Sequence, residues 1–188
     1  GVLTALMWII CMIISSVMSI AGPVTNVFYP GVVAIPNGIV MMLLLAKVPK
    51  KGVFTINGVI QGILFLLVGG FWTISAALIV GGVICDFLIM AREKVSMKSM
   101  IIASTIYSGI FSFGAIVCPM NFLQSAFVAA MEKNGIEQEY IDGMIRITSG
   151  FMPVVIIVAG LLGGLIGGYI GQKALKKHFI KAGLVSAK

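Results

Sequence analysis

Charged residues in this sequence of 188 residues lie almost entirely in the connections between long apolar stretches, and these connections alternate between basic and not basic. The connections after the second, fourth and sixth stretches are basic, whereas those after the first and third carry no charge. Lysine and arginine are retained on the cytoplasmic side of short membrane-protein loops. The alternation therefore predicts six transmembrane helices with both termini inside. The inside residues are Lys47, Lys50, Lys51, Arg92, Lys94, Lys98, Lys173, Lys176, Lys177, Lys181 and Lys188, and only Lys133 and Arg146 lie outside.

The composition excludes an ordinary soluble domain, because 60% of the residues are hydrophobic and only 10% are charged. Each span takes about 20 apolar residues, so six helices use roughly 120 residues and leave only short loops. We therefore expect a single membrane domain over residues 1–188. The net charge of +7 is dispersed over three loops, which indicates membrane topology rather than nucleic-acid binding.

We expect an all-α membrane bundle, preceded by a short cytoplasmic lead-in. The segment between the last two helices holds four acids and is only partly apolar, which predicts two short interfacial helices that form a lid over an outward-facing site. Pro36-Asn37-Gly38 interrupts the second helix, and such irregularity is tolerated where protein or a cavity satisfies the backbone, so this helix is expected to form a cavity wall. The predicted helices cover residues 2–20, 32–48, 53–70, 73–91, 99–118 (stopped by Pro119) and 147–171 (kinked at Pro153), and the outer segment covers 121–145.

Several polar and aromatic residues fall in the outer half of this arrangement. A few polar anchors among apolar walls are typical of a small-molecule pocket. Tyr29 and Trp72 could equally belong to an interfacial aromatic belt, and Arg146 could pair with Glu139 or Asp142 instead of a ligand anion. The candidate substrate-binding residues are Asn26, Tyr29, Asn37, Trp72, Asn121, Tyr140 and Arg146.

Small residues recur at four-residue spacing near both ends of the chain. Glycines at this spacing let two helix backbones approach closely within lipid, either inside one chain or between subunits. The last helix carries two such rows, and Gly1 and Ala5 form a shorter pair in the first helix. The candidate subunit-docking residues are Gly1, Ala5, Gly160, Gly164 and Gly168.

Asp86 is the only carboxylate well inside an apolar stretch. Two interpretations stay open: a structural anchor near the cytoplasmic end of its helix, or part of an ion or proton pathway. The three cysteines form no CxxC motif and predict neither a disulfide nor a metal site. GxxxxGK[ST], HExxH and GxSxG are absent, so we expect no bound cofactor and no enzymatic activity.

The chain resembles the substrate-binding S-component of an energy-coupling factor (ECF) ABC transporter, and more narrowly the Trep_Strep group, also called MptD-type. The likeness rests on the six-helix layout, on the stretch Gly81 to Asp86 followed by a basic loop, and on the ending from Gly163 to Phe179 with Lys181-Ala182-Gly183 after it. The resemblance covers the whole chain.

The resemblance implies a subunit in a bacterial plasma membrane that captures a vitamin or cofactor-like micronutrient from outside. It would deliver this substrate by docking on a membrane T-component driven by two cytosolic ATPases, and the loop between the first two helices would act as a gate. In the family, the first helix carries an AxxxA docking pair, whose place is taken here by Gly1 and Ala5.

Two other hypotheses remain at this stage. The first is a stand-alone ion-coupled transporter that uses Asp86, and the second is a scaffold subunit that binds no ligand. The substrate is not identified by the sequence: the candidate pocket suits a vitamin, or haem or a related tetrapyrrole.

Overall fold

The computed structural model describes residues 1–50, 52–90 and 96–176, and every element in this part of the chain is helical. Six long helices form the bundle, and short helices join them at one end. The long helices are α1 (Val2–Ile20), α3 (Tyr29–Lys47), α4 (Val53–Leu67), α5 (Trp72–Met90), α6 (Met97–Ser112) and α10 (Met152–Ala174). The short ones are α2 (Pro23–Val27), the π-helical η1 (Phe113–Val117), α7 (Cys118–Phe122), α8 (Gln124–Lys133) and α9 (Gln138–Ile147).

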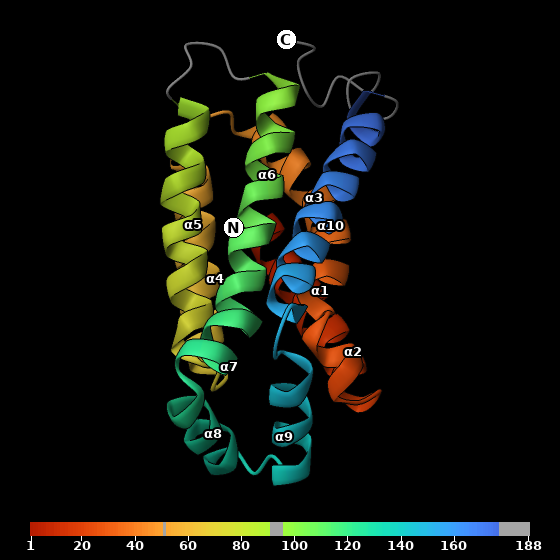
Figure 1. Ribbon diagram of the computed structural model, residues 1–188. Helices are drawn as coiled ribbons and strands as arrows, with labels where there is room; N and C mark the ends of the chain where they lie inside the picture. The colour runs from red at the N-terminus through yellow and green to blue at the C-terminus, as the bar shows by residue number, and fades with distance from the viewer. Residues whose placement is uncertain (51, 91–95, 177–188) are drawn as a thin grey trace.

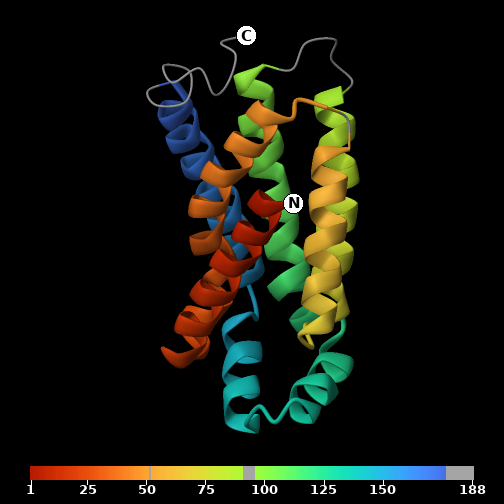
Figure 2. The ribbon, with the colours of Figure 1, turned by 180° about the vertical axis from the view of Figure 1, so that it is seen from behind.

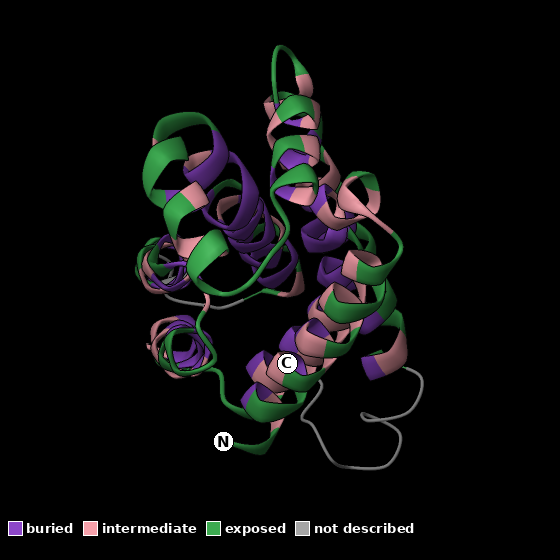
Figure 3. Cartoon of the chain, turned by 90° about the horizontal axis from the view of Figure 1, so that it is seen from below, coloured by how far each residue is buried: buried purple, intermediate pink, exposed green. Residues whose placement is uncertain are grey.

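The long helices are arranged as a ring. α3 packs against α1 and α10, α10 packs against α6, and α6 packs against α5, which pairs with α4; contacts between α4 and α1 complete the ring. Figures 1 and 2 show α4 and α5 on one side of the bundle and α1, α3 and α10 on the other, with α6 between them. Viewed from the α8–α9 end, the buried residues face the inside of the bundle and exposed residues cover its outer faces (Figure 3).

The ring has two chemically different ends. The connection after α3, the start of α6 and the end of α10 lie at one end, and they carry Lys47, Lys50, Lys98, Lys173 and Lys176. The opposite end holds α2, the connection between α4 and α5, and the α8–α9 pair (Figure 1). The segregation of basic residues expected from the sequence is therefore present. The other basic residues expected inside, which are Lys51, Arg92, Lys94, Lys177, Lys181 and Lys188, lie outside the described residues, as do Ala91 and the tail from His178.

Within the described part of the chain, four helical segments are long and apolar enough to cross a membrane, namely Val2–Ile20, Tyr29–Lys47, Met97–Phe122 and Met152–Ala174. Val53–Leu67 and Trp72–Leu88 are apolar but shorter. At 1.5 Å per residue, the 15 residues of α4 extend about 22 Å, less than the roughly 30 Å of hydrocarbon. The chain is thus a helical membrane protein, and six spans remain a prediction.

Helix boundaries differ from the expected ones mainly at the end that carries α8 and α9. The expected loop 21–31 contains α2, and α3 already begins at Tyr29 and continues through Pro36 without a break. The last long helix begins at Met152 rather than at 147, because α9 extends to Ile147 and Gly150, at φ +63°, allows the chain to turn.

The effects of two prolines on their helices were also predicted wrongly. Pro153 lies in the first turn of α10, where its missing N–H leaves no hydrogen bond unmade, so it starts the helix rather than kinking it. Pro119 likewise sits in the first turn of α7, so the helical run from Met97 ends at Phe122 instead of before Pro119.

The glycines of α10 mediate its packing inside the chain. Gly163 and Gly167 face α3, where an added Cβ would meet the carbonyl oxygens of Gly31 and Ile35. The other row faces α6, where a Cβ on Gly164 would lie 2.9 Å from the Cβ of Ser108. Close approach of backbones is the reason for glycine at such positions.

This packing corrects the assignment of Gly160, Gly164 and Gly168 as a surface for another subunit. All three are buried, and their neighbours are residues of α6, so in this conformation no partner can reach them. Gly1 and Ala5 differ, because both are exposed and no atom lies within 4 Å of a Cβ built on Gly1. Of the predicted docking residues, only this pair lies on an accessible surface.

Gly163→Ala is expected to destabilise the bundle by about 1–3 kcal/mol, because the new methyl group overlaps the carbonyl oxygen of Gly31. Thermal unfolding in detergent measures the effect. Gly1→Ala serves as the control and should change stability little, since its Cβ enters open space. Equal melting temperatures for the two variants would contradict this packing.

The orientation of the two ends can be tested by labelling single cysteines in a variant without Cys11, Cys85 and Cys118. Ser125→Cys in α8 should react with a membrane-impermeant maleimide added to intact cells, whereas Lys50→Cys should react only after the membrane is opened. Both positions are exposed, so a difference in labelling reports sidedness. The reverse pattern would invert the predicted topology.

Candidate functional site

A mainly apolar space lies at the α8–α9 end of the bundle, and we call it the outer cavity. Its volume is about 540 Å³, within the usual range for small-molecule sites. Nearly every element at this end contributes to its wall. The lining residues are Ser19, Ile20, Asn26, Tyr29, Gly70, Phe71, Ile74, Ala115, Ile116, Met120, Phe127, Met131, Gly135, Ile136, Glu137, Tyr140, Ile141 and Met144.

The wall of the outer cavity is mostly apolar. Some of its few polar groups already form hydrogen bonds within the chain, and others do not. The side-chain amide of Asn26 donates weakly to the sulfur of Met144 at 3.6 Å. Tyr140 donates its hydroxyl to the carbonyl oxygen of Ser19 at 3.2 Å. Tyr29 is only 7% exposed, and its hydroxyl forms no hydrogen bond with a described residue. The Tyr29 hydroxyl is therefore a donor without a partner among the described residues.

The α8–α9 pair covers the outer cavity, and its residues Phe127 and Ile141 are buried. Asn134, between the two helices, donates its side-chain amide to the carbonyl oxygen of Gly69 at 3.3 Å. Phe127 packs edge-to-face on Phe71, with ring centroids 5.7 Å apart. α9 also packs against α2. Two short helices therefore lie where the sequence predicted them, and their role as a lid stays a prediction.

Three of the seven predicted pocket residues are brought together in the outer cavity: Asn26, Tyr29 and Tyr140. They come from α2, α3 and α9. Their shared feature in the sequence is position, since each lies in or beside one of the two segments that join helices at this end.

The other four predicted residues lie elsewhere. Trp72 is 54% exposed and points away from the outer cavity, although its neighbour Phe71 lines it. Asn121 is exposed and donates to the carbonyl oxygen of Val117 at 3.1 Å. Arg146 is exposed in a separate surface depression, because it belongs to α9 and not to the last long helix. The structure therefore does not bring these three residues into the outer cavity, and Asn37 lies deeper, as described next.

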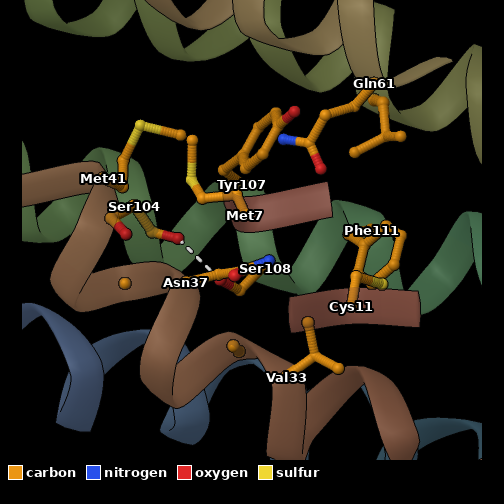
Figure 4. Close-up of a pocket in the computed structure, with 13 residues that line it drawn as sticks. Met7, Cys11, Val33, Asn37, Met41, Gln61, Ser104, Tyr107, Ser108 and Phe111 are labelled. Carbon is orange, nitrogen blue, oxygen red and sulfur yellow. Dashed lines mark hydrogen bonds between the residues drawn. The ribbon is translucent and has the colours of Figure 1, made fainter. Parts of the chain in front are cut away.

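Asn37 lines a second, smaller space in the middle of the bundle, the inner cavity, of about 30 Å³. Figure 4 shows it between α1, α3, α4 and α6, with the Gln61 amide turned towards Tyr107. The Asn37 side-chain oxygen has no hydrogen-bond partner among the described residues, nor does that of Asn57 nearby in α4. The space can hold water, and water would satisfy these buried oxygens, which are costly to leave unpaired.

An aromatic layer separates the two cavities. Tyr29 lines the outer cavity and Phe111 lines the inner one, and their rings pack edge-to-face with centroids 6.1 Å apart. Phe65 extends this layer, with its ring 6.4 Å from that of Phe111. α3 therefore forms a cavity wall, as its Pro36-Asn37-Gly38 segment predicted, but Asn37 faces the inner cavity.

Much of the outer wall was not predicted from the sequence. Phe127 and Met131 recur at four-residue spacing in α8, as do Tyr140 and Met144 in α9, so their helical spacing was a usable signal. Phe71 and Met120 carry no such signal, because apolar residues beside a turn or a helix end are common in any membrane protein. Their contribution follows only from how η1, α7 and α8 turn back over the bundle.

Asp86 caps a helix of its own chain. Its carboxylate accepts hydrogen bonds from the backbone N–H groups of Phe54 and Thr55, at 3.2 and 2.8 Å, and from the Thr55 hydroxyl at 2.6 Å. α4 begins after Gly52 with no side-chain cap from its own sequence, so Asp86 of α5 satisfies its first donors and the positive end of its dipole. This geometry favours the structural interpretation of Asp86.

Comparison with known proteins identifies the chain only at the level of a family. The sequence model of Trep_Strep, described as a hypothetical bacterial integral membrane protein, matches residues 1–181. No curated protein and no solved structure gives a significant match.

Asp86→Asn is expected to lower the free energy of unfolding by about 1–2 kcal/mol, because the amide offers one acceptor oxygen where the carboxylate offers two. Thermal unfolding measures this loss, and Glu132→Gln on the exposed end of α8 is the matched control. Unchanged stability combined with loss of transport would instead assign Asp86 to an ion pathway.

Proposed function

We propose that this chain, which belongs to the Trep_Strep family of bacterial integral membrane proteins, is the substrate-capture subunit of an ECF-type importer. In this proposal it binds a vitamin or cofactor-like micronutrient at the outer face of the plasma membrane and catalyses no reaction. A membrane T-component and two cytosolic ATPases are the partners that drive release.

The observation that carries this proposal is the position and shape of the outer cavity. It has the volume of a small-molecule site, it lies at the end opposite the basic loops, and the α8–α9 pair covers it. Lysine-rich loops remain in the cytoplasm, so a molecule entering from the other side would meet this cavity first. A covered apolar cavity with few polar anchors suits capture of a scarce solute.

The packed interior below the outer cavity supports the hypothesis that this subunit cannot complete transport alone. The aromatic layer of Tyr29, Phe111 and Phe65 closes the floor, and fully buried side chains such as Phe54 and Met42 fill the bundle beyond it. A solute therefore needs a large rearrangement, or reorientation of the whole subunit by a partner, to reach the cytoplasm. Asp86, the acid that an ion-coupled transporter would use, is engaged as a helix cap.

A surface for the T-component is available on α1. This helix packs mainly on α3 and leaves a broad apolar face uncovered, with Ile13 59% and Val17 61% exposed. Gly1 and Ala5 lie on the exposed surface of the same helix, about halfway between the two ends of the bundle (Figures 1 and 2). Small residues there would let a partner helix approach closely.

Native mass spectrometry of the gently purified chain tests the proposal, and we expect a co-purified small molecule, with or without the T-component and ATPases. An engineered disulfide across the lid tests whether that molecule lies in the outer cavity. A Cβ on Gly143 would lie 3.3 Å from the Cβ of Pro23, so Pro23→Cys with Gly143→Cys should join α2 to α9 across the lid.

The oxidised double variant should retain the bound molecule through extended washing, and a reductant should release it. Pro23→Cys alone is the control and should lose the molecule under both conditions. A chain that purifies empty and without partners in every form would contradict the proposed function.

A further inference from the structure

In the described part of the chain, the outer cavity is lined by negative charge and by no positive charge. Glu137 is the one lining residue that is charged at neutral pH among those that the structure describes. Of the described basic residues at this end of the bundle, neither lines it: Lys133 lies at the end of α8, and Arg146 lies with Glu139 and Asp142 in a neighbouring depression, which Glu137 and Tyr140 also line. A ligand in the outer cavity therefore meets one carboxylate and no cation.

The field outside the outer cavity has the same sign. The described segment from α8 to α9 carries Glu132, Glu137, Glu139 and Asp142 against Lys133 and Arg146, a balance of four negative charges and two positive ones. Charges of one sign around a low-dielectric mouth raise the local concentration of oppositely charged ligands. Cations are attracted to this entrance and anions are repelled.

Aromatic and thioether groups form much of the remaining wall. Tyr29, Phe71, Phe127 and Tyr140 present rings, and methionine sulfurs lie between them. Ring faces attract flat apolar groups and cations, and thioethers adapt to aromatic edges. These rings and thioethers offer no positive charge to a carboxylate or a phosphate.

An anion would lose its hydration in the outer cavity without gaining a partner of opposite charge, and burial of an unpaired charge is costly. A neutral ligand avoids that loss and can bond the unpaired Tyr29 hydroxyl. A cationic ligand can in addition place its charge near Glu137 at the rim. For ligands that share one ring system, the wall therefore favours binding of the cation and the neutral form over binding of the anion.

We propose that the outer cavity is selective for a neutral or cationic, ring-bearing and largely apolar molecule, and that it excludes ligands whose charge is a carboxylate or phosphate. This inference rests on the proposed function, which it narrows to a substrate class. It disfavours haem and other tetrapyrroles that carry carboxylates, and it removes the role of ligand partner from Arg146.

Three indole compounds test the inference with one ring system and three charges: tryptamine (cation), tryptophol (neutral) and indole-3-propionate (anion). Binding to the purified full chain is measured as the ligand-induced rise in melting temperature at concentrations up to millimolar. A thiol-reactive dye reads unfolding through the buried cysteines Cys11 and Cys85. We expect tryptamine and tryptophol to stabilise the chain and indole-3-propionate to bind at least tenfold more weakly than tryptamine.

Glu137→Gln should weaken tryptamine binding about two- to fivefold, as expected for a partly exposed ion pair, and leave tryptophol unchanged. Glu139→Gln, two residues away and outside the outer cavity, is the matched control and should preserve the ranking. Tyr29→Phe should weaken all three compounds alike, because it removes a hydroxyl and no charge.

Equal or tighter binding of indole-3-propionate would overturn the inference while leaving the capture function intact. Failure of all three compounds would also overturn it. Native mass spectrometry then separates the two proposals, since a co-purified anion retains the capture function and an empty chain removes both.

Discussion

Close contact between α10 and two neighbouring helices is the constraint on which the rest of the bundle depends. Lipid provides no hydrophobic drive for helix association, so backbones must approach closely enough for dispersion forces to act. Gly163 and Gly167 permit this against the carbonyl oxygens of α3, and Gly164 permits it against Ser108 of α6. Since α3 and α6 carry Tyr29 and Phe111, this packing also sets the floor of the outer cavity.

The outer cavity is assembled from segments that are short and far apart in the sequence. The end of α1, the start of α3, the α4–α5 connection and the α8–α9 pair each supply a few side chains. Hydrogen bonds from Asn134 to Gly69 and from Tyr140 to Ser19 tie the lid to the ends of three long helices. A bundle covered by two short helices would suit a site that opens to solvent and closes around a solute.

Asp86 illustrates how a lone acid in an apolar helix can be structural. α4 starts without a side-chain cap of its own, and the N–H groups of its first turn would otherwise be unpaired between two packed helices. The carboxylate from α5 satisfies two of them and also bonds the Thr55 hydroxyl. A charge that would mark an ion pathway in another setting here fixes α4 against α5.

The sequence by itself determined the helical membrane character of the chain, the separation of basic and acidic ends, and the position of the lid segment, because hydropathy and charge act locally along the chain. The sequence also shows glycines at helix-packing spacing, but it does not show which helices they contact. Only the tertiary structure decided that Gly160, Gly164 and Gly168 pack on α6, and that Arg146, Trp72 and Asn121 lie outside the outer cavity. The reason is rotational: one residue more or less before a helix begins rotates its side chains by about 100°, and packing against distant helices selects among these rotations.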